Sequence, residues 1–224
     1  MSLIQSLKNA VVRVIGRDRA NRITAPYYDR QARRRTSERL AKLPAKDLQL
    51  NLGCGSQPLP GWVNVDIARG PQIDVVWDLT RGLPFPDESC SVIYSEHVIE
   101  HLSKTDAATL LRECFRVLQV GGVVRVSTLD TERFLRSYAG NCEFLHDPGF
   151  AETIETPLDR INMMMRENGQ HLWVYDHESL ALALRRAGFS TVVQQKFGES
   201  AHERLRQMDT PARAFETLYI EGIK

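Results

Sequence analysis

Short runs of β-forming residues alternate with helical patterns from residue 47 onward, and this alternation constrains the fold more than any other feature of the sequence. Apolar and β-branched runs bounded by turn residues predict strands at 48–52, 62–66, 73–77, 91–95 and 123–127. Strands that alternate with helices favour a parallel sheet of the α/β class. Two further runs, at 189–195 and 215–220, predict a pair of strands at the edge of that sheet.

Capping residues mark the expected helix boundaries. A side chain that accepts from the first turn favours a helix start, and a glycine just past the last turn favours a helix end. We expect a helix at 104–118 between Ser103 and Gly121, a second between Thr156 and Gly169, and a third between Asp176 and Gly188. The pattern is looser over about residues 130–177, which we interpret as an insertion.

A basic segment precedes the α/β pattern, and we expect an arm over residues 1–46 followed by a domain over 47–224. The arm carries 12 Lys and Arg residues against three acidic ones, a balance of +9, which leaves −8 for the rest of a chain with net charge +1. Apolar residues at helical spacing from Leu3 to Ile15 predict an amphipathic helix. We expect residues 1–22 to dock on the acidic body or on a second copy of the chain, as a homodimer. A peripheral membrane contact is the alternative. Nucleic acid is not an expected partner.

Composition excludes several classes of protein. The chain has 224 residues, of which 42% are hydrophobic and 25% charged, as in ordinary globular proteins. No apolar run approaches the roughly 18 residues of a membrane span, and no secretory signal is recognisable. The four cysteines lie far apart and lack the spacing of a metal pair. We therefore expect a reduced, cytoplasmic protein without a disulfide scaffold or a metal site.

Glycines follow the first predicted strand, and an acidic residue ends the second. Gly53 and Gly55 would let a ligand approach the backbone closely, and Asp66 can accept hydrogen bonds from ribose hydroxyls. The third glycine and immediate helix that pyrophosphate recognition needs do not follow Gly55. The pattern favours a nucleoside ligand without a phosphate. Asp78, after the third strand, is either an adenine contact or a turn cap.

Taken together, these blocks resemble the class I methyltransferases that depend on S-adenosylmethionine, specifically the type 11 group and a bacterial subgroup of unassigned substrate. The matching segments, in the family's order, are 52–55, Asp66, 78–79, 83–87, 100–102 and 116–122, with 59–66 for the subgroup. The resemblance covers about residues 48–128. It implies a Rossmann-like sheet of seven strands, the last antiparallel, with S-adenosyl-L-methionine across the carboxyl ends of strands one to four.

The resemblance also assigns cofactor contacts by motif position. It places Gly53, Cys54 and Gly55 at the methionine portion, Asp66 with Ile67 at the ribose, Asp78 and Leu79 at the adenine, and Ser95 and Glu96 at the methionine end and the substrate. One departure concerns the link between the first two strands, which is too short for a crossover helix. We expect this helix to be reduced or missing, and the N-terminal helices to cover the face left bare.

Methyl transfer to a hydroxyl of a small-molecule or glycan-type acceptor is the function that we expect. The insertion supplies aromatic and histidine side chains suited to such an acceptor, namely Tyr138, His146, His171, Trp173 and Tyr175. His97 and His171 are the candidate catalytic bases, because a hydroxyl acceptor gains from a base with a near-neutral pKa. Structural roles for both histidines, and core roles for Trp173 and Tyr175, stay open.

Three alternatives compete with this interpretation. Residues 97–101 match the H-x-x-E-H pattern of one zinc peptidase group, with both histidines on one helical face, but they directly follow a strand. An aminopropyl transferase on the same scaffold would need more acids than Glu96 and Glu100 after the fourth strand. The third alternative is a binding protein that keeps the fold without the chemistry, which the missing helix favours.

Overall fold

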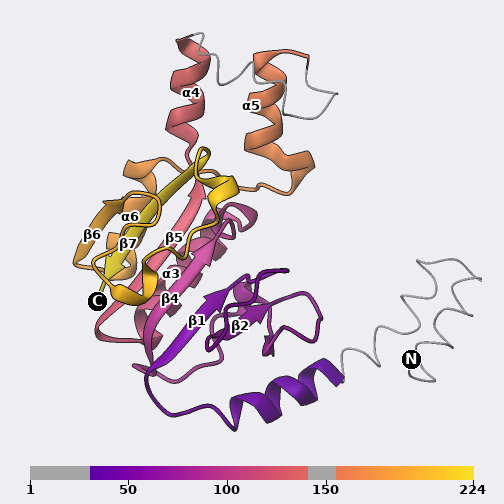
Figure 1. Cartoon of the computed structure of the whole chain (residues 1–224), viewed down its shortest axis with the longest axis vertical. Helices are drawn as coiled ribbons and strands as arrows, with labels where there is room; N and C mark the ends of the chain where they lie inside the picture. The colour runs from indigo at the N-terminus through magenta and orange to yellow at the C-terminus, as the bar shows by residue number, and fades with distance from the viewer. Residues whose placement is uncertain (1–30, 141–154) are drawn as a thin grey trace, which may run out of the picture.

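The computed structural model describes residues 31–140 and 155–224, in which seven strands form one sheet (Figure 1). Their order is β3-β2-β1-β4-β5-β7-β6. The strands are β1 Leu48–Leu52, β2 Val63–Asp66, β3 Val75–Val76, β4 Cys90–Glu96, β5 Leu118–Leu129, β6 Thr191–Gln195 and β7 Thr217–Ile223. The five strands from β3 to β5 pair in parallel, whereas β7 runs antiparallel to both β5 and β6. The expected seven-stranded sheet with its last strand antiparallel is confirmed.

Two long helices cover one face of this sheet. They are α3 Lys104–Val117 and α6 His177–Ala187, which pack on inward residues such as Ile93 and Val124. The predicted caps are confirmed, since Ser103 accepts from Asp106 N and Asp176 accepts from Ser179 N. The first helix ends at Val117, within one residue of the expected Leu118, but the glycines do not stop it and the strand expected from Val123 begins earlier. The chain enters β5 directly at Leu118, because this residue already pairs with Cys90, so the glycines lie within the strand.

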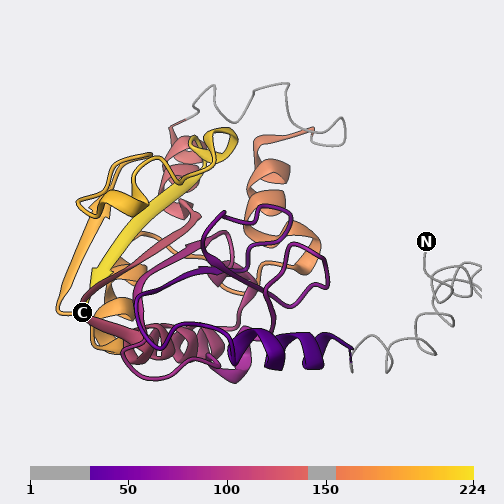
Figure 2. The same ribbon diagram turned by 60° about the horizontal axis from the view of Figure 1, so that its bottom comes forward.

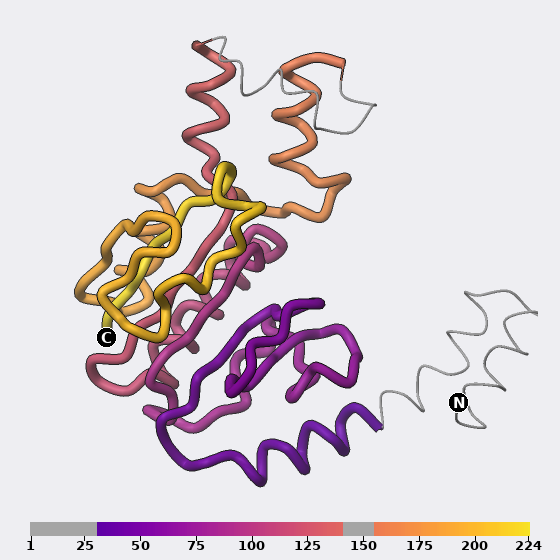
Figure 3. The backbone as a smooth tube through the Cα atoms, in the orientation of Figure 1, coloured from indigo at the N-terminus to yellow at the C-terminus, as the bar shows by residue number. Residues whose placement is uncertain are grey.

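The link between β1 and β2 contains no helix, as expected, and Figure 3 traces it as a loop. The face that this helix would have covered carries Val92 and Tyr94, which pack against Leu205 and Met208 from the β6–β7 segment. The N-terminal helices were expected there; the one expected within residues 1–22 lies outside the described residues, and the one that is described lies elsewhere. Residues 31–40 form a helix (Figure 2) whose Leu40 joins the cluster beneath α3, on the other face.

The segment between β6 and β7, residues 196–216, is anchored by a buried ion cluster. Arg125 of β5 is fully buried and contacts Asp209 Oδ1 at 2.8 Å and Glu221 Oε1 at 2.8 Å. It also donates to the backbone oxygens of Lys196 and Glu199. These bonds tie the start of the segment, at Lys196 and Glu199, and its later residue Asp209 to β5, and the segment covers the face that lacks a helix.

The expected insertion forms two helices that project beyond the end of the sheet (Figure 1). These are α4 Thr131–Ala139 and α5 Pro157–Arg166, and residues 141–154 between them, which include the candidate His146, lie outside the described residues. Phe134 and Met164 pack together between the two helices. Thr156 caps α5 as predicted, but the helix ends at Arg166 rather than at Gly169 because Glu167 already adopts a left-handed conformation.

The remaining described helices are short 3-10 turns. They are η1 Leu79–Arg81, η2 Ile99–His101, η4 Glu167–Gly169, η5 Glu203–Leu205 and η6 Pro211–Arg213. Within residues 31–140 and 155–224, no helix combines the length and the apolar character that a membrane span requires. Residues 1–30 are not described, so the amphipathic helix expected there stays a prediction.

Candidate active site

The glycine turn after β1 has one glycine needed for packing and one that faces open space. Gly53 has a φ of +68°, and a Cβ on it would lie 2.2 Å from Cγ2 of Val98. Gly55 has a φ of +49°, and a Cβ on it would meet no atom within 4 Å. Only glycine adopts such φ values without strain. Gly53 is therefore needed for packing against Val98, whereas the space in front of Gly55, at the end of the sheet, is open to a ligand.

Asp66 ties the end of β2 to this turn. Its carboxylate accepts from the backbone N–H of Gly55 at 2.8 Å and from that of Ala68 at 2.6 Å. Ile67, the next residue, is an exposed apolar side chain. The arrangement places a carboxylate and an exposed apolar side chain beside the open space at Gly55.

Asp78 and Leu79 lie at the end of β3 with local roles. Asp78 Oδ1 accepts from Thr80 N at 3.0 Å and from Thr80 Oγ1 at 2.7 Å, so the turn-cap reading describes its contacts. Leu79 is buried in the core beneath α3. Asp78 also lines a cavity of about 380 Å³, together with Ile67 and Trp77. We call it the third cavity, to distinguish it from the first and second cavities described below.

A cavity of about 200 Å³ lies where β1 and β4 end, and we call it the first cavity. Its lining residues include Gly53, Cys54, Gly55, Glu96, His97 and Arg213. Burial, with the Asp66 charge adding to it, raises the pKa of the Cys54 thiol to about 11, so this side chain is a neutral wall of the cavity. Ser95 is buried within β4.

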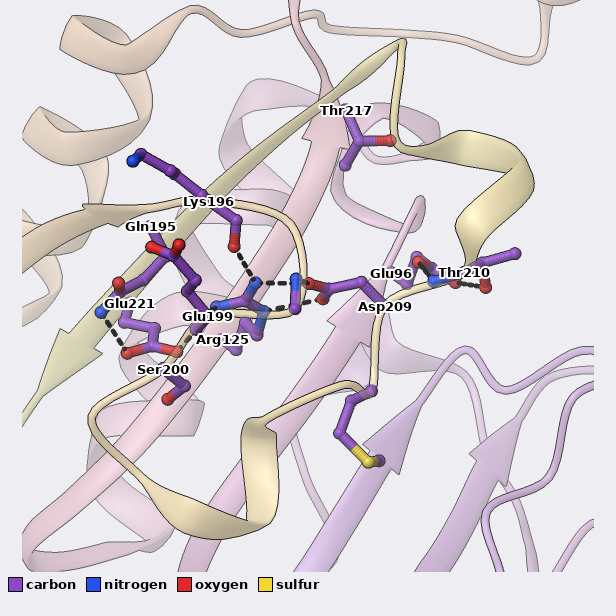
Figure 4. Close-up of polar contacts among 12 residues, drawn as sticks. Glu96, Arg125, Gln195, Lys196, Glu199, Ser200, Asp209, Thr210, Thr217 and Glu221 are labelled. Atoms are coloured by element: carbon purple, nitrogen blue, oxygen red, sulfur yellow. Dashed lines mark hydrogen bonds and ion pairs between the residues drawn. The ribbon is translucent and has the colours of Figure 1, made fainter.

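Glu96 is engaged by the segment that crosses the bare face of the sheet. Its Oε1 accepts from Thr210 N at 3.0 Å and its Oε2 from Thr210 Oγ1 at 2.6 Å (Figure 4). Asp209, the preceding residue, belongs to the buried cluster around Arg125. The wall of the first cavity is thus coupled to the anchor of residues 196–216.

His97 directly follows β4 in a left-handed conformation, with a φ of +50°. Its Nδ1 lies 2.9 Å from Glu100 Oε1, and its Nε2 lies 2.8 Å from Thr217 Oγ1. The Thr217 hydroxyl donates to Arg213 O, so it accepts from His97 Nε2. Both ring nitrogens therefore have an oxygen atom close by, one from Glu100 and one from Thr217.

Glu100 is the buried counterpart of His97. Burial opposes its charge, but the hydrogen bond and the charge of His97 outweigh burial and hold the pKa of this carboxyl below its usual value of 4.5. The side chain is fully buried. A histidine and a carboxylate held as an ion pair close the bottom of the site.

A second cavity, of about 440 Å³, adjoins the first, and both are lined by His97 and Arg213. Its other lining residues include His101, Met164, Glu167, His171 and Glu216. Burial raises the pKa of the Glu216 carboxyl. His171, a candidate base from the sequence, lines this cavity. Arg213 and Glu216 were not among the candidates, because no local motif distinguishes them.

The other candidate acceptor residues lie elsewhere. Trp173 and Tyr175 line a different cavity, beside α6, and Lys104 Nζ lies 4.7 Å from the centroid of the Trp173 ring. Tyr175 is buried, as the core reading of this residue holds. Tyr138 is exposed on α4. Of the insertion residues named as candidates and described by the structure, His171 alone lines the second cavity.

The zinc peptidase arrangement of residues 97–101 is not formed. These residues make a 3-10 turn after β4 rather than a long helix. His97 contacts Glu100 and Thr217, whereas His101 Nδ1 lies 3.3 Å from Gln170 O. The two histidines thus face different groups.

Part of the chain is similar in sequence to known methyltransferases. Residues 50–126 match a family model described as a methyltransferase domain. A probable S-adenosylmethionine-dependent methyltransferase of Mycolicibacterium smegmatis is 48% identical over 61 residues, which are 27% of this chain and 23% of that protein. One of Mycobacterium tuberculosis is 43% identical over 61 residues, which are 27% of this chain and 22% of that protein. The matched segment spans less than a quarter of these curated relatives.

The fold is shared with a solved structure over nearly its whole length. A methyltransferase of Thermotoga maritima, described as SAM-dependent and as a possible histamine N-methyltransferase, has a TM-score of 0.51 at 19% identity, covering 91% of this chain and 98% of that one. The fold is the Rossmann-like fold of the class I methyltransferases. Residues 50–126 are similar to the methyltransferase-domain family, and S-adenosyl-L-methionine is the cofactor that these matches indicate.

Proposed function

We propose that this protein transfers the methyl group of S-adenosylmethionine to a hydroxyl of a small-molecule or glycan-type acceptor. The observation that carries the proposal is the pair of adjoining cavities that share His97 and Arg213. The first cavity lies at the glycine turn, where the family places the methyl donor. The second offers polar and thioether side chains to an acceptor.

The methyl donor, S-adenosylmethionine, would lie across the carboxyl ends of the strands. Asp66 would accept from the ribose hydroxyls, with Ile67 and the third cavity on the adenine side. Asp78 and Leu79 would border the adenine through the turn that they form after β3. Gly53, Cys54, Gly55, Ser95 and Glu96 would surround the methionine portion. Because Glu96 is engaged with Thr210, binding of the donor's ammonium at Glu96 would compete with that contact.

The reaction needs alignment and the removal of one proton. The acceptor oxygen forms a bond to the methyl carbon while the carbon–sulfur bond breaks, and sulfur keeps the electron pair as the thioether of S-adenosylhomocysteine. The hydroxyl proton leaves to a base or to water. His97 and His171 are the candidate bases. Both ring nitrogens of each have a partner, Glu100 and Thr217 for His97, and Met164 O and Glu167 for His171, so a base would have to exchange one partner for the acceptor hydroxyl.

Charge and size favour a compact acceptor. The second cavity, of about 440 Å³, falls within the roughly 300–1,000 Å³ of small-molecule sites. Residues 47–224 are acidic overall, which disfavours contacts with a phosphate backbone. An aminopropyl transferase and an inactive binding protein are the competing functions. The three described cysteines are free and buried, which supports a reducing, cytoplasmic location as part of this proposal.

Calorimetry with S-adenosylmethionine tests the cofactor assignment. We expect Asp66→Ala to weaken binding by about 1–3 kcal/mol, the scale of a lost charge-assisted hydrogen bond. Asp74→Ala is the matched control, since Asp74 also accepts from a backbone N–H, that of Asn64 at 2.9 Å, but lines none of the three cavities. Equal affinities of the two variants would overturn the ribose assignment.

Transfer of a labelled methyl group identifies the acceptor class. The donor carries a tritiated methyl, and the acceptors offered are sugar nucleotides, polysaccharide precursors, phenols and RNA. We expect label on a hydroxyl-bearing small molecule or glycan precursor. Label on RNA alone would contradict the proposal, and binding of the donor without transfer to any acceptor class would favour the inactive binding protein.

A further inference from the structure

Two histidines and a glutamate meet on the wall of the second cavity. They come from separate elements, His101 from η2, Glu167 from the end of α5 and His171 from the loop that follows. Their ligating atoms all lie within 4.8 Å of one another. Glu167 Oε2 is 3.1 Å from His171 Nε2 and 3.8 Å from His101 Nε2, so both rings face the same carboxylate oxygen.

Backbone carbonyls fix the orientation of both rings. His171 Nδ1 lies 2.7 Å from Met164 O, and His101 Nδ1 lies 3.3 Å from Gln170 O. A carbonyl oxygen can only accept, so each Nδ1 carries a proton. In a neutral imidazole the lone pair is then on Nε2 and faces the Glu167 carboxylate. The Nε2 lone pairs of the two histidines and the Glu167 carboxylate are all hydrogen-bond acceptors and repel one another. A positive charge between them, from a bound cation or from further protons, would remove this repulsion.

The loop that carries His171 is held firmly against η2. The carbonyl oxygen of Glu100 accepts from Leu172 N at 2.8 Å and from Trp173 N at 3.2 Å. Glu167 and Asn168 both have positive φ, of 37° and 55°, a conformation that costs energy in residues other than glycine. The strained turn and the two hydrogen bonds together bring Glu167 and His171 to the histidine that follows Glu100.

From this geometry we propose that His101, Glu167 and His171 bind one divalent transition-metal ion, with zinc as the first candidate. Two imidazoles and one carboxylate, with a further position open, are the ligand set of many catalytic zinc sites. Bond lengths of about 2.0–2.1 Å in a tetrahedron place ligand atoms about 3.3 Å apart. The contacts at 3.1 and 3.8 Å are near this spacing, and the two histidine nitrogens, which lie within 4.8 Å of each other, would move together as the ion binds. A carbonyl oxygen on the second ring nitrogen is the usual support of a metal-bound histidine.

The site departs from the sequence expectation of no metal, and it unites different residues from those of the H-x-x-E-H pattern. His97 of that pattern is excluded, and His171 takes its place. The open position faces the same cavity as His97 and Arg213. A hydroxyl bound there would lose its proton more readily, and His171 would then act as a ligand rather than as a base. Metal binding itself does not depend on the identity of the acceptor.

Titration of the full, tag-free chain with metal tests the site. After treatment with a chelator and its removal, Zn²⁺ is added in competition with a chromophoric chelator, and Co²⁺ is added while its visible absorption is recorded. We expect one ion per chain. Glu167→Gln, His101→Ala and His171→Ala should each weaken binding by about 100-fold or more, beyond the effect of losing a supporting partner.

His177→Ala is the matched control, because this histidine begins α6 and is no part of the cluster. It should bind the ion as the parent does. Glu167→Gln keeps the size of a half-exposed side chain, so it tests the site without disturbing the core. Zn²⁺ should also raise the melting temperature of the parent and not that of Glu167→Gln. Absence of saturable binding, or binding that all three ligand variants retain, would overturn the proposal and leave protons as the source of the positive charge.

Discussion

Gly53 and Gly55 both have a left-handed backbone conformation, but they differ in the atoms that a Cβ would meet. Val98 packs against Gly53, while Gly55 faces open space in the first cavity. Gly55→Ala should therefore act in two ways. The left-handed alanine costs about 1–2 kcal/mol of stability, and the added methyl group occupies space proposed for the cofactor. We expect weaker S-adenosylmethionine binding, measured by calorimetry on the folded variant.

Gly61→Ala separates these two effects. Gly61 has a φ of +81°, its Cβ would also meet nothing within 4 Å, and it lines none of the three cavities. It should lose about as much stability as Gly55→Ala and bind S-adenosylmethionine as the parent does. If both variants bind the cofactor equally well, the place of the methionine portion at Gly55 is wrong.

The buried pair of His97 and Glu100 makes stability depend on pH. The folded-state pKa of Glu100 lies below its usual value of 4.5, so its contribution is present above about pH 4.5 and is lost as the pH falls through the folded-state value. Denaturation in urea at pH 7 and at pH 4 should show Glu100→Gln less stable than the parent at pH 7 and the gap reduced at pH 4. Glu178→Gln, exposed on α6, is the control. A gap that is the same at both pH values would contradict the ion pair.

Residues that act through their neighbours in sequence could be predicted, and residues that act through distant contacts could not. Gly53, Gly55 and Asp66 follow strands that the apolar pattern already marks, and the structure brings the carboxylate of Asp66 to the N–H of Gly55. The partner of His97 Nε2 is Thr217, which is 120 residues away. Nothing in the local sequence of either residue indicates that contact.

Element boundaries followed the same rule. Side-chain caps are local, so the starts of α3, α5 and α6 were predicted correctly. The end of α3 was predicted to within one residue, but the start of β5 was not, because Leu118 already pairs with Cys90 across the sheet and the glycines lie inside the strand. The role of residues 196–216 was also missed. They have no regular pattern, and their place is set by the buried charge of Arg125.

Arg125→Met tests that anchor. The substitution leaves the buried carboxylates of Asp209 and Glu221 without their cation, so we expect a loss of about 3–5 kcal/mol in the free energy of unfolding. Limited proteolysis should also cut residues 196–216 faster than in the parent. Arg204→Met, which removes an exposed contact with Gln49, should change stability by no more than about 0.5 kcal/mol. Similar losses in the two variants would show that the segment is held by its apolar contacts instead.

At the scale of the whole molecule, the order of motifs predicted the sheet better than it predicted the layers around it. A short link between β1 and β2 correctly indicated a missing helix, but not what replaces it. The bare face is covered by residues 196–216, and the helix at 31–40 lies with α3 on the other face. The described part of the N-terminal arm therefore does not cover that face, and the partner of residues 1–30, which the structure does not describe, stays a prediction.

Deletion of residues 1–22 tests what that partner is. The first 46 residues carry +9 and the remainder −8, so we expect the arm to dock on the acidic body or on a second copy of the chain. The deletion should lower the melting temperature or change the oligomer size measured by light scattering, and added salt should weaken the difference because it screens exposed charges. Leu7→Asp with Val11→Asp keeps the basic residues but breaks the apolar stripe, and it should reproduce the deletion if the helix packs through that stripe. Unchanged stability and size, together with lost binding to anionic vesicles, would instead assign the arm to a membrane surface.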